Sequence, residues 1–187
     1  LLPVFYAHAG FGAAPPLAEQ RRFVSTPDVY ARLVARCGAI VADLPGGVLG
    51  IAPHSLRAAT LPEIAGILPL AGGGPVHIHV AEQVAEVEAC RAHHGTGPVR
   101  LLLDHAPVDR RWCLIHATHM DDDEVAGVAT RGAIAGLCPI TEANLGDGIF
   151  AGMAFRAAGG RFGVGSDSNV AISLAGELRQ YEYSQRL

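Results

Sequence analysis

Apolar positions along the chain follow two alternating patterns. Six short and nearly continuous apolar runs are bounded by glycine, proline or polar residues, at 1–7, 48–52, 75–81, 111–117, 133–137 and 161–164. Longer stretches between most of them repeat apolar residues every three or four positions. The first pattern is typical of strands that are buried on both faces, and the second is typical of amphipathic helices. The alternation predicts a parallel sheet covered by helices.

The clearest helical pattern begins after Thr26 and runs to Leu44. Thr26 is a capping residue ahead of Pro27, which stands at the expected first helical position, and a proline and two glycines follow the pattern and end it. Its apolar stripe, which we expect to face inward, consists of Tyr30, Leu33, Val34, Cys37, Ile40, Val41 and Leu44.

Three more helices carry signals of their own. Thr60 and Glu63 form a capping box ahead of one, and the acidic residues at 121–123 supply a cap and favourable negative charge for another. A further helix is expected near 83–93, after the third apolar run.

The number of strand-helix units narrows the fold class. About six units suit either a doubly wound sheet or most of a (β/α)8 barrel, which typically needs about 250 residues. Polar residues finish nearly every expected strand, and no Gly-x-Gly-x-x-Gly turn follows the first one. We therefore predict an α/β fold, a partial (β/α)8 barrel of about six βα units. The chain starts at Leu1 inside an expected strand, and so we expect the first strands of the barrel to be absent.

Composition and charge indicate chemistry on a small molecule. The formal charge is −4, and no basic run is longer than a pair, so the sequence carries no electrostatic footprint for nucleic acid or an anionic membrane. No apolar stretch approaches the roughly 20 residues that span a bilayer. The four cysteines form no Cys-x-x-Cys pair, which argues against a structural zinc knuckle or a disulfide framework and fits a reducing cytoplasm.

The third expected strand ends in a group of polar residues. His77 and His79 share one face of it because strand side chains alternate, and both would point into a barrel. Glu82 follows three residues after His79. An imidazole that holds a metal and a carboxylate that moves protons can serve one reaction. The alternative is a hydrogen-bonded core histidine and a glutamate that starts the next helix.

Two later strands end in similar groups. His116 ends the fourth run, and His119 lies in the loop after it. Either one is a candidate ligand or electrophilic imidazole, although His119 equally suits a solvent-exposed position before the next helix. Asp167 follows the last strand and three small residues, where a carboxylate can bind metal or simply cap a turn.

Together, the residues at these strand ends resemble the site pattern of the amidohydrolase superfamily. Its barrels carry a metal-binding histidine after strand five, a histidine after strand six and an aspartate after strand eight, and the His-x-x-Glu spacing resembles the deaminase branch. Four longer stretches are similar to the formimidoylglutamate deiminases of histidine degradation, at 6–12, 52–57, 77–83 and 138–148. The resemblance implies that residues 1–187 are part of a single metal-dependent barrel domain, running roughly from strand three to strand eight.

The resemblance also implies roles for individual residues. His79 and Asp167 match ligands of one divalent ion, expected to be zinc, with another divalent metal as the alternative. Glu82 matches the proton shuttle and His116 the second catalytic imidazole, while Asp167 also serves as general base. The family's His-x-His pair from the first strand has no counterpart in this chain, so we expect only part of the metal site and an inactive truncated chain.

The implied reaction is the hydrolysis of N-formimidoyl-L-glutamate to N-formyl-L-glutamate and ammonia. His54 and Arg57 match residues that hold the glutamate portion, and a guanidinium suits a bidentate grip on a carboxylate. A loop position exposed to solvent is the alternative for both residues. The only partner expected is this small-molecule substrate, without nucleic acid or membrane, and a homodimer is left open.

Two other functions stay open at this point. A related aminohydrolase acting on a purine, adenosyl or triazine ring would have an aromatic pocket and no need of Arg57. A barrel segment that only packs or associates would have no chemistry of its own. The zinc deaminases with a Pro-Cys-x-x-Cys signature are disfavoured, because Cys138-Pro139 has the wrong order and no partner cysteine.

Overall fold

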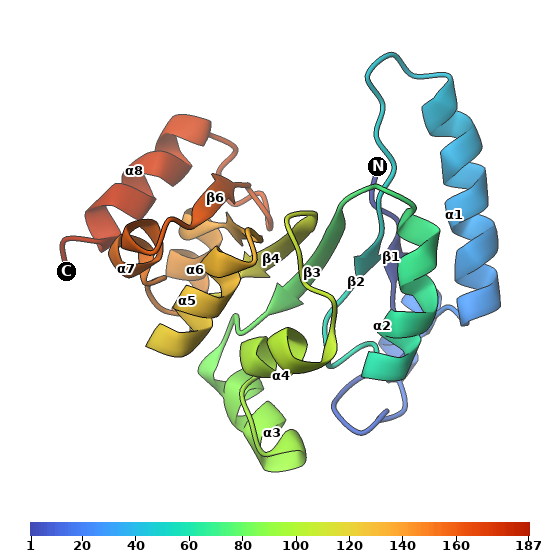
Figure 1. The fold of residues 1–187 in the computed structure, drawn as a ribbon, viewed down its shortest axis with the longest axis horizontal. Helices are drawn as coiled ribbons and strands as arrows, with labels where there is room; N and C mark the ends of the chain where they lie inside the picture. The colour runs from blue at the N-terminus through green and yellow to red at the C-terminus, as the bar shows by residue number, and fades with distance from the viewer. The chain divides into compact units, whose positions relative to one another are not determined.

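The computed structural model describes residues 1–187 and contains six strands connected largely by helices (Figure 1). Each strand lies within one of the apolar runs or overlaps it by a residue: β1 (Val4–Phe5), β2 (Ala52–Pro53), β3 (Val76–Val80), β4 (Trp112–His116), β5 (Ile134–Leu137) and β6 (Arg161–Val164). The chain divides into two compact units, Leu1–Ile78 and His79–Leu187. None of the helices is both long and apolar enough to cross a bilayer.

The first unit is built on short parallel pairings. Val4 lies opposite Ala52 in the β1–β2 pair, and an isolated parallel bridge joins Ile51 to Val76. Its helices are α1 (Pro27–Ala42), α2 (Leu61–Ile67) and the 3-10 helices η1 (Ala18–Phe23) and η2 (Leu68–Ala71). The Tyr30 side chain of α1 is fully buried against the strands, where its hydroxyl donates to the carbonyl of Pro3 at 2.8 Å.

The ends of α1 confirm the capping prediction, while its buried face is narrower than expected. Thr26 Oγ1 accepts the Val29 N–H at 3.3 Å, and Pro27 is the first helical residue. The expected inward positions Leu33, Ile40 and Leu44 are instead 43%, 59% and 55% exposed. The helix buries only the stripe of Tyr30, Val34 and Val41, and the rest of its apolar surface faces away from this unit.

The second unit contains the larger sheet. Its strand order is β3-β4-β5-β6, and the β4–β5 and β5–β6 pairings are parallel. The helices are α3 (Val84–His94), α4 (Pro98–His105), α5 (Asp122–Thr130), α6 (Pro139–Leu145), α7 (Gly152–Ala157) and α8 (Leu174–Ser184). The helices contact one another in the pairs α3–α4, α4–α5, α5–α7 and α6–α8, and Figure 1 shows α4 beside α3. This architecture confirms the predicted α/β class.

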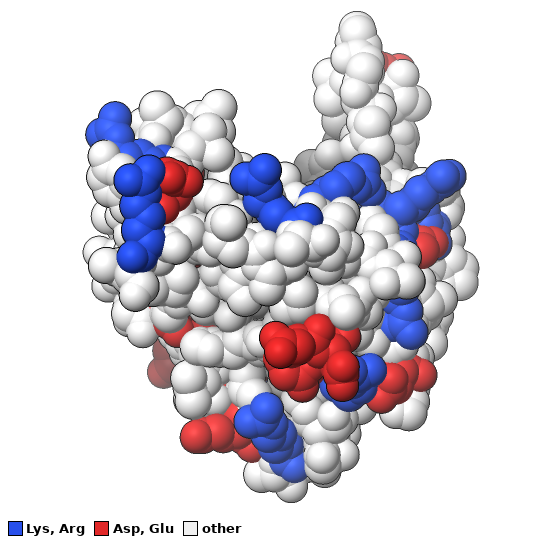
Figure 2. Space-filling view, turned by 60° about the vertical axis from the view of Figure 1, so that its left-hand side comes forward, with Lys and Arg blue, Asp and Glu red and all other residues white.

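Side chains on the sheet alternate between its two faces. In both β3 and β4, every second residue is buried, beginning with Val76 and Trp112. His77 and His79 occupy the intermediate positions of β3 and so share one face, as the period of two predicts. On the face drawn in Figure 2, basic side chains are interrupted by uncharged surface and by acidic groups.

Candidate active site

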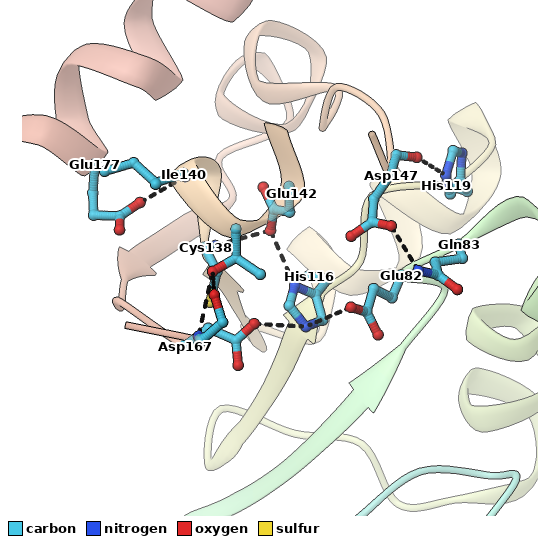
Figure 3. A network of polar contacts seen from close by, with 12 residues as sticks. Glu82, Gln83, His116, His119, Cys138, Ile140, Glu142, Asp147, Asp167 and Glu177 are labelled. Carbon is cyan, nitrogen blue, oxygen red and sulfur yellow. Dashed lines mark hydrogen bonds and ion pairs between the residues drawn. The ribbon is translucent and has the colours of Figure 1, made fainter. Parts of the chain in front are cut away.

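Four of the predicted site residues come together around one buried imidazole at the carboxyl ends of the strands. His116, the last residue of β4, is 1% exposed. Its Nε2 lies 3.6 Å from Oε1 of Glu82 and 4.0 Å from Oδ2 of Asp167 (Figure 3). The His79 ring stacks on it, with centroids 5.7 Å apart. Both carboxylates are slightly too distant for a direct hydrogen bond, so their oxygens and Nε2 face a shared space.

The backbone is strained where these residues are presented. Of the six residues other than glycine with a positive φ, four lie at this site: Ala81 (51°), His116 (66°), Ala117 (50°) and Asp167 (41°). These residues follow or end β3, β4 and β6, the strands that carry the predicted site. Each left-handed residue with a Cβ costs about 1–3 kcal/mol, and such costs concentrate at functional sites. The sequence did not reveal this strain, because none of these positions is a glycine.

Glu142 is a member of the site that the sequence analysis did not single out. Its Oε1 lies 3.2 Å from Nδ1 of His116 and accepts the peptide N–H of Cys138 at 2.8 Å. The side chain is 5% exposed and belongs to α6, a helix of seven residues that was not predicted. The stretch at 138–148 had supported the resemblance, but it carried no chemical signal for this glutamate.

The charges around His116 are mainly negative. Burial lowers the pKa of His116, but the hydrogen bond to Glu142 and the charges of Glu82, Glu142 and Asp167 outweigh it and raise the pKa above its ordinary value. Burial, with the nearby carboxylates, raises the pKa of the Cys138 thiol to about 12. Such surroundings favour a cation at this end of the sheet.

A second buried glutamate shapes the turn that carries Glu82. Glu86, in the first turn of α3, is 4% exposed and accepts the peptide N–H groups of Ala81 at 3.2 Å and Glu82 at 3.1 Å. The donors are the residues that pass through the left-handed turn after β3. Glu86 therefore satisfies backbone groups that the strand pairing leaves behind.

His119 connects the loop after β4 to the loop after α6. Its Nε2 lies 2.7 Å from the carbonyl oxygen of Asp147, and the Asp147 carboxylate accepts the side-chain N–H of Gln83 at 2.8 Å. An added Cβ at Gly148, where φ is +135°, would lie 3.0 Å from Cε1 of His119. This contact gives His119 a partner in the fold, so the solvent-exposed alternative does not describe it.

The donor set fits a divalent cation. His79 supplies an imidazole nitrogen and Asp167 a carboxylate oxygen, both preferred by zinc and similar metals. A second group, formed by His116, Cys138 and Glu142, has ligand atoms within 4.8 Å of one another. Glu142 Oε1 in that group already accepts the Cys138 peptide N–H. That His79 and Asp167 hold the ion stays a prediction.

The predicted substrate residues lie in the first unit. His54 Nδ1 is 3.1 Å from Oγ of Ser55, and its ring meets the Tyr6 ring edge-on at 4.9 Å. A pocket of about 510 Å³ is lined by Val4, Tyr6, Gln20, Phe23 and His54. Arg57 follows β2 in the same unit. The roles of His54 and Arg57 stay predictions.

Residues 7–186 match the sequence model of the amidohydrolase family. The chain belongs to the amidohydrolase family. It is 52% identical over 188 residues to formimidoylglutamate deiminase from Pseudomonas aeruginosa, a match that covers 100% of this chain and 41% of the relative. It is 30% identical to 5-methylthioadenosine/S-adenosylhomocysteine deaminase from Natronomonas pharaonis, over 75% of this chain and 35% of that relative.

Solved structures of the family have the same fold. An amidohydrolase from Brucella melitensis has a TM-score of 0.98 and 60% identity, covering 100% of this chain and 42% of the other. An adenosine deaminase from Xanthomonas campestris with bound zinc has a TM-score of 0.83 at 23% identity, covering 98% of this chain and 40% of the other, which shows the fold alone. The amidohydrolase chain thus spans less than half of each of these relatives.

These matches confirm the predicted family and the partial (β/α)8 barrel of the amidohydrolase type. That residues 1–187 form part of a single barrel domain, from about strand three to strand eight, stays a prediction. The catalytic, metal-binding and substrate-binding roles of the individual residues are likewise carried forward as proposals.

Proposed function

We propose that this amidohydrolase chain is part of a formimidoylglutamate deiminase, which hydrolyses N-formimidoyl-L-glutamate to N-formyl-L-glutamate and ammonia in histidine degradation. The observation that carries the proposal is the 52% identity to a named deiminase across the whole chain. The convergence of Glu82 and Asp167 on His116 supports it, because proton transfer to and from a reacting amidine needs such groups within reach.

In this proposal, His79 and Asp167 hold one divalent ion, expected to be zinc. The bound ion supplies a Lewis acid that lowers the pKa of water to near neutrality. Because the chain spans only 41% of the related deiminase, the proposed activity is that of the complete protein. Three of the four cysteines lie in the second unit and none forms a disulfide, which fits the cytoplasmic location that we include in the proposal.

Protons move between this chain's own residues and the substrate. Asp167 accepts a proton from the attacking water, whose oxygen adds to the formimidoyl carbon. Nε2 of His116 accepts a hydrogen bond from the hydroxyl group that forms on the carbon, and Glu82 delivers the two protons that came from the water to the departing nitrogen. Breakage of that C–N bond releases ammonia and leaves the formyl group on the glutamate nitrogen. His54 and Arg57 bind the glutamate portion, with Arg57 on a carboxylate.

A second candidate is deamination of an adenosyl compound. The pocket bounded by Tyr6, Phe23 and His54 is partly aromatic, and such rings suit stacking on a purine. The relative from Natronomonas pharaonis is a 5-methylthioadenosine/S-adenosylhomocysteine deaminase. Its lower identity makes this the less favoured function.

The deciding experiment measures ammonia release by the complete protein from N-formimidoyl-L-glutamate and from S-adenosylhomocysteine. We expect turnover of the first compound only. Arg57→Ala should raise KM by about 10- to 100-fold, since charge-assisted hydrogen bonds contribute about 1.5–3 kcal/mol each. Arg186→Ala, which removes a surface ion pair with Glu182, is the matched control.

Three outcomes would reject the proposal. Turnover of the adenosyl compound alone would favour the second candidate. An unchanged KM in the Arg57→Ala enzyme would show that Arg57 does not bind a substrate carboxylate. A complete protein without bound metal or ammonia release would favour a barrel segment that only packs or associates.

A further inference from the structure

We propose that Glu142 is a positioning residue that fixes the ring orientation of His116, with the proton on Nδ1 and Nε2 turned toward Glu82 and Asp167. The inference rests on the proposed function for its kinetic test, but its geometry stands independently. Glu142 touches neither of the proposed metal ligands through a recorded contact, and it acts through His116 (Figure 3).

The hydrogen bonds of one oxygen atom settle the direction of the contact. Glu142 Oε1 accepts the peptide N–H of Cys138 at 2.8 Å, and a peptide nitrogen can only donate. The same oxygen lies 3.2 Å from Nδ1 of His116. Because that oxygen is an acceptor, Nδ1 is the donor and carries the proton. The other ring nitrogen is then the one that reaches the shared space.

The ring has two orientations that fill nearly the same volume. A half turn about the Cβ–Cγ bond would exchange Nδ1 with Cδ2 and Nε2 with Cε1. In the turned orientation, Glu142 would face a carbon and lose its donor, while Glu82 and Asp167 would face a carbon in place of Nε2. Glu142 is 5% exposed, so an unmet charge there would be costly. The buried carboxylate therefore selects the orientation that suits the chemistry.

A nearby glutamate offers a matched control. Glu177 on α8 is 2% exposed, and its Oε2 accepts the peptide N–H of Ile140 at 2.9 Å. It supports the same helix, α6, that carries Glu142, but it has no recorded contact with His116. Loss of Glu177 tests whether support of α6 alone accounts for any effect.

The experiment compares the complete wild-type protein with Glu142→Ala, Glu142→Gln and Glu177→Ala. It measures kcat and KM for ammonia release, bound metal, and the protonated ring nitrogen of His116 by 15N NMR of the metal-free protein, assigned with His116→Gln. Thermal melts identify any variant that fails to fold.

We expect Glu142→Ala to lower kcat by about 10- to 100-fold, as loss of a partner behind a functional histidine typically does. KM should stay within about twofold, because Glu142 does not contact the substrate. The Nδ1–H signal of His116 should weaken, and an Nε2–H signal should appear. Glu142→Gln keeps an acceptor oxygen and should retain the Nδ1–H signal and most of kcat. Glu177→Ala should lower the melting temperature and leave the NMR signal unchanged.

The role is wrong if Glu142→Ala keeps both its kcat and the Nδ1–H signal, or if Glu177→Ala reduces kcat equally. Loss of bound metal in both Glu142 variants would instead make Glu142 a ligand. If the wild-type protein does not act on N-formimidoyl-L-glutamate, the proposed function fails, and the NMR comparison still decides the role of Glu142.

Discussion

Glu86 accepts the peptide N–H of Glu82 at 3.1 Å and so anchors the backbone of the proposed proton shuttle from within the next helix. The same carboxylate also accepts from Ala81, whose φ is +51°. A single buried side chain therefore secures a strained turn that would otherwise leave two peptide donors unmet.

Replacement of Glu86 by alanine should destabilise the fold and slow catalysis. Two peptide donors lose their acceptor, which costs about 1–3 kcal/mol each when a buried group is left unsatisfied. Urea unfolding and kcat of the complete protein measure the two effects. Glu88→Ala, at an exposed position of the same helix, should stay within about 0.5 kcal/mol of wild type. Equal behaviour of the two variants would show that Glu86 does not support the turn.

Glu63 should make stability depend on pH in the acidic range. Burial raises its pKa, but hydrogen bonds from Thr60 and His8 outweigh it, so the pKa in the folded state lies below the ordinary 4.5. The unfolded chain then binds the proton more tightly, so this stabilisation is present above 4.5 and is lost as pH falls through the lower folded value. Urea unfolding of wild type and Glu63→Gln from about pH 7 to about pH 3 tests this. The variant should lose part of the acid-dependent decline, and parallel curves would contradict the assignment.

Gly148 should not tolerate a side chain. Its φ of +135° is accessible almost only to glycine, and an added Cβ would press on the His119 ring. Gly148→Ala should therefore destabilise by about 1–3 kcal/mol in a thermal or urea melt. Gly66→Ala is the control, because it lies within α2 with no atom within 4 Å of the added Cβ. That variant should be neutral or stabilised by about 0.5–1 kcal/mol.

Metal binding should depend on His79 and Asp167. We expect His79→Ala and Asp167→Ala to lose bound metal and ammonia release, as measured by elemental analysis and assay of the complete protein. His93→Ala, at an exposed position of α3, should retain both. A chelator should lower the melting temperature of wild type, because a ligand bound only by the folded state stabilises it. Full metal content in the Asp167 variant would remove that residue from the ligand set.

The features predicted best from the sequence were the residues that cap helix N-termini. Thr26, Thr60 and Asp121 each cap the helix that was expected after them, because capping involves only a few neighbouring residues. Helix α4 was missed because it is only eight residues long and its core residues Leu101, Leu102 and Leu103 are consecutive, so no three- or four-residue apolar spacing appears in the sequence. Helix α8 was also missed, although Leu174, Leu178 and Tyr181 repeat at helical spacing; of its residues only Glu177 and Tyr181 are buried.

The site was predictable only in part. His79, Glu82, His116 and Asp167 could be found because each lies near or just after the carboxyl end of a strand, and parallel strands end at one edge. Glu142 and Glu86 lie on helices, and their importance comes from contacts with backbone and ring atoms that residue spacing does not reveal. Likewise, the exposure of Leu33 and Ile40 depends on which surface α1 meets, a property of packing rather than of sequence period.

The left-handed backbone at Ala81 and Ala117 has a practical consequence for engineering. Glycine at these two alanines would relieve steric conflict without removing an imidazole or a carboxylate, so heat tolerance could be gained there at little catalytic expense. The same relief at His116 or Asp167 would sacrifice the reactive groups themselves. Thermal stability can therefore be changed without changing the catalytic rate at Ala81 and Ala117, but not at His116 and Asp167.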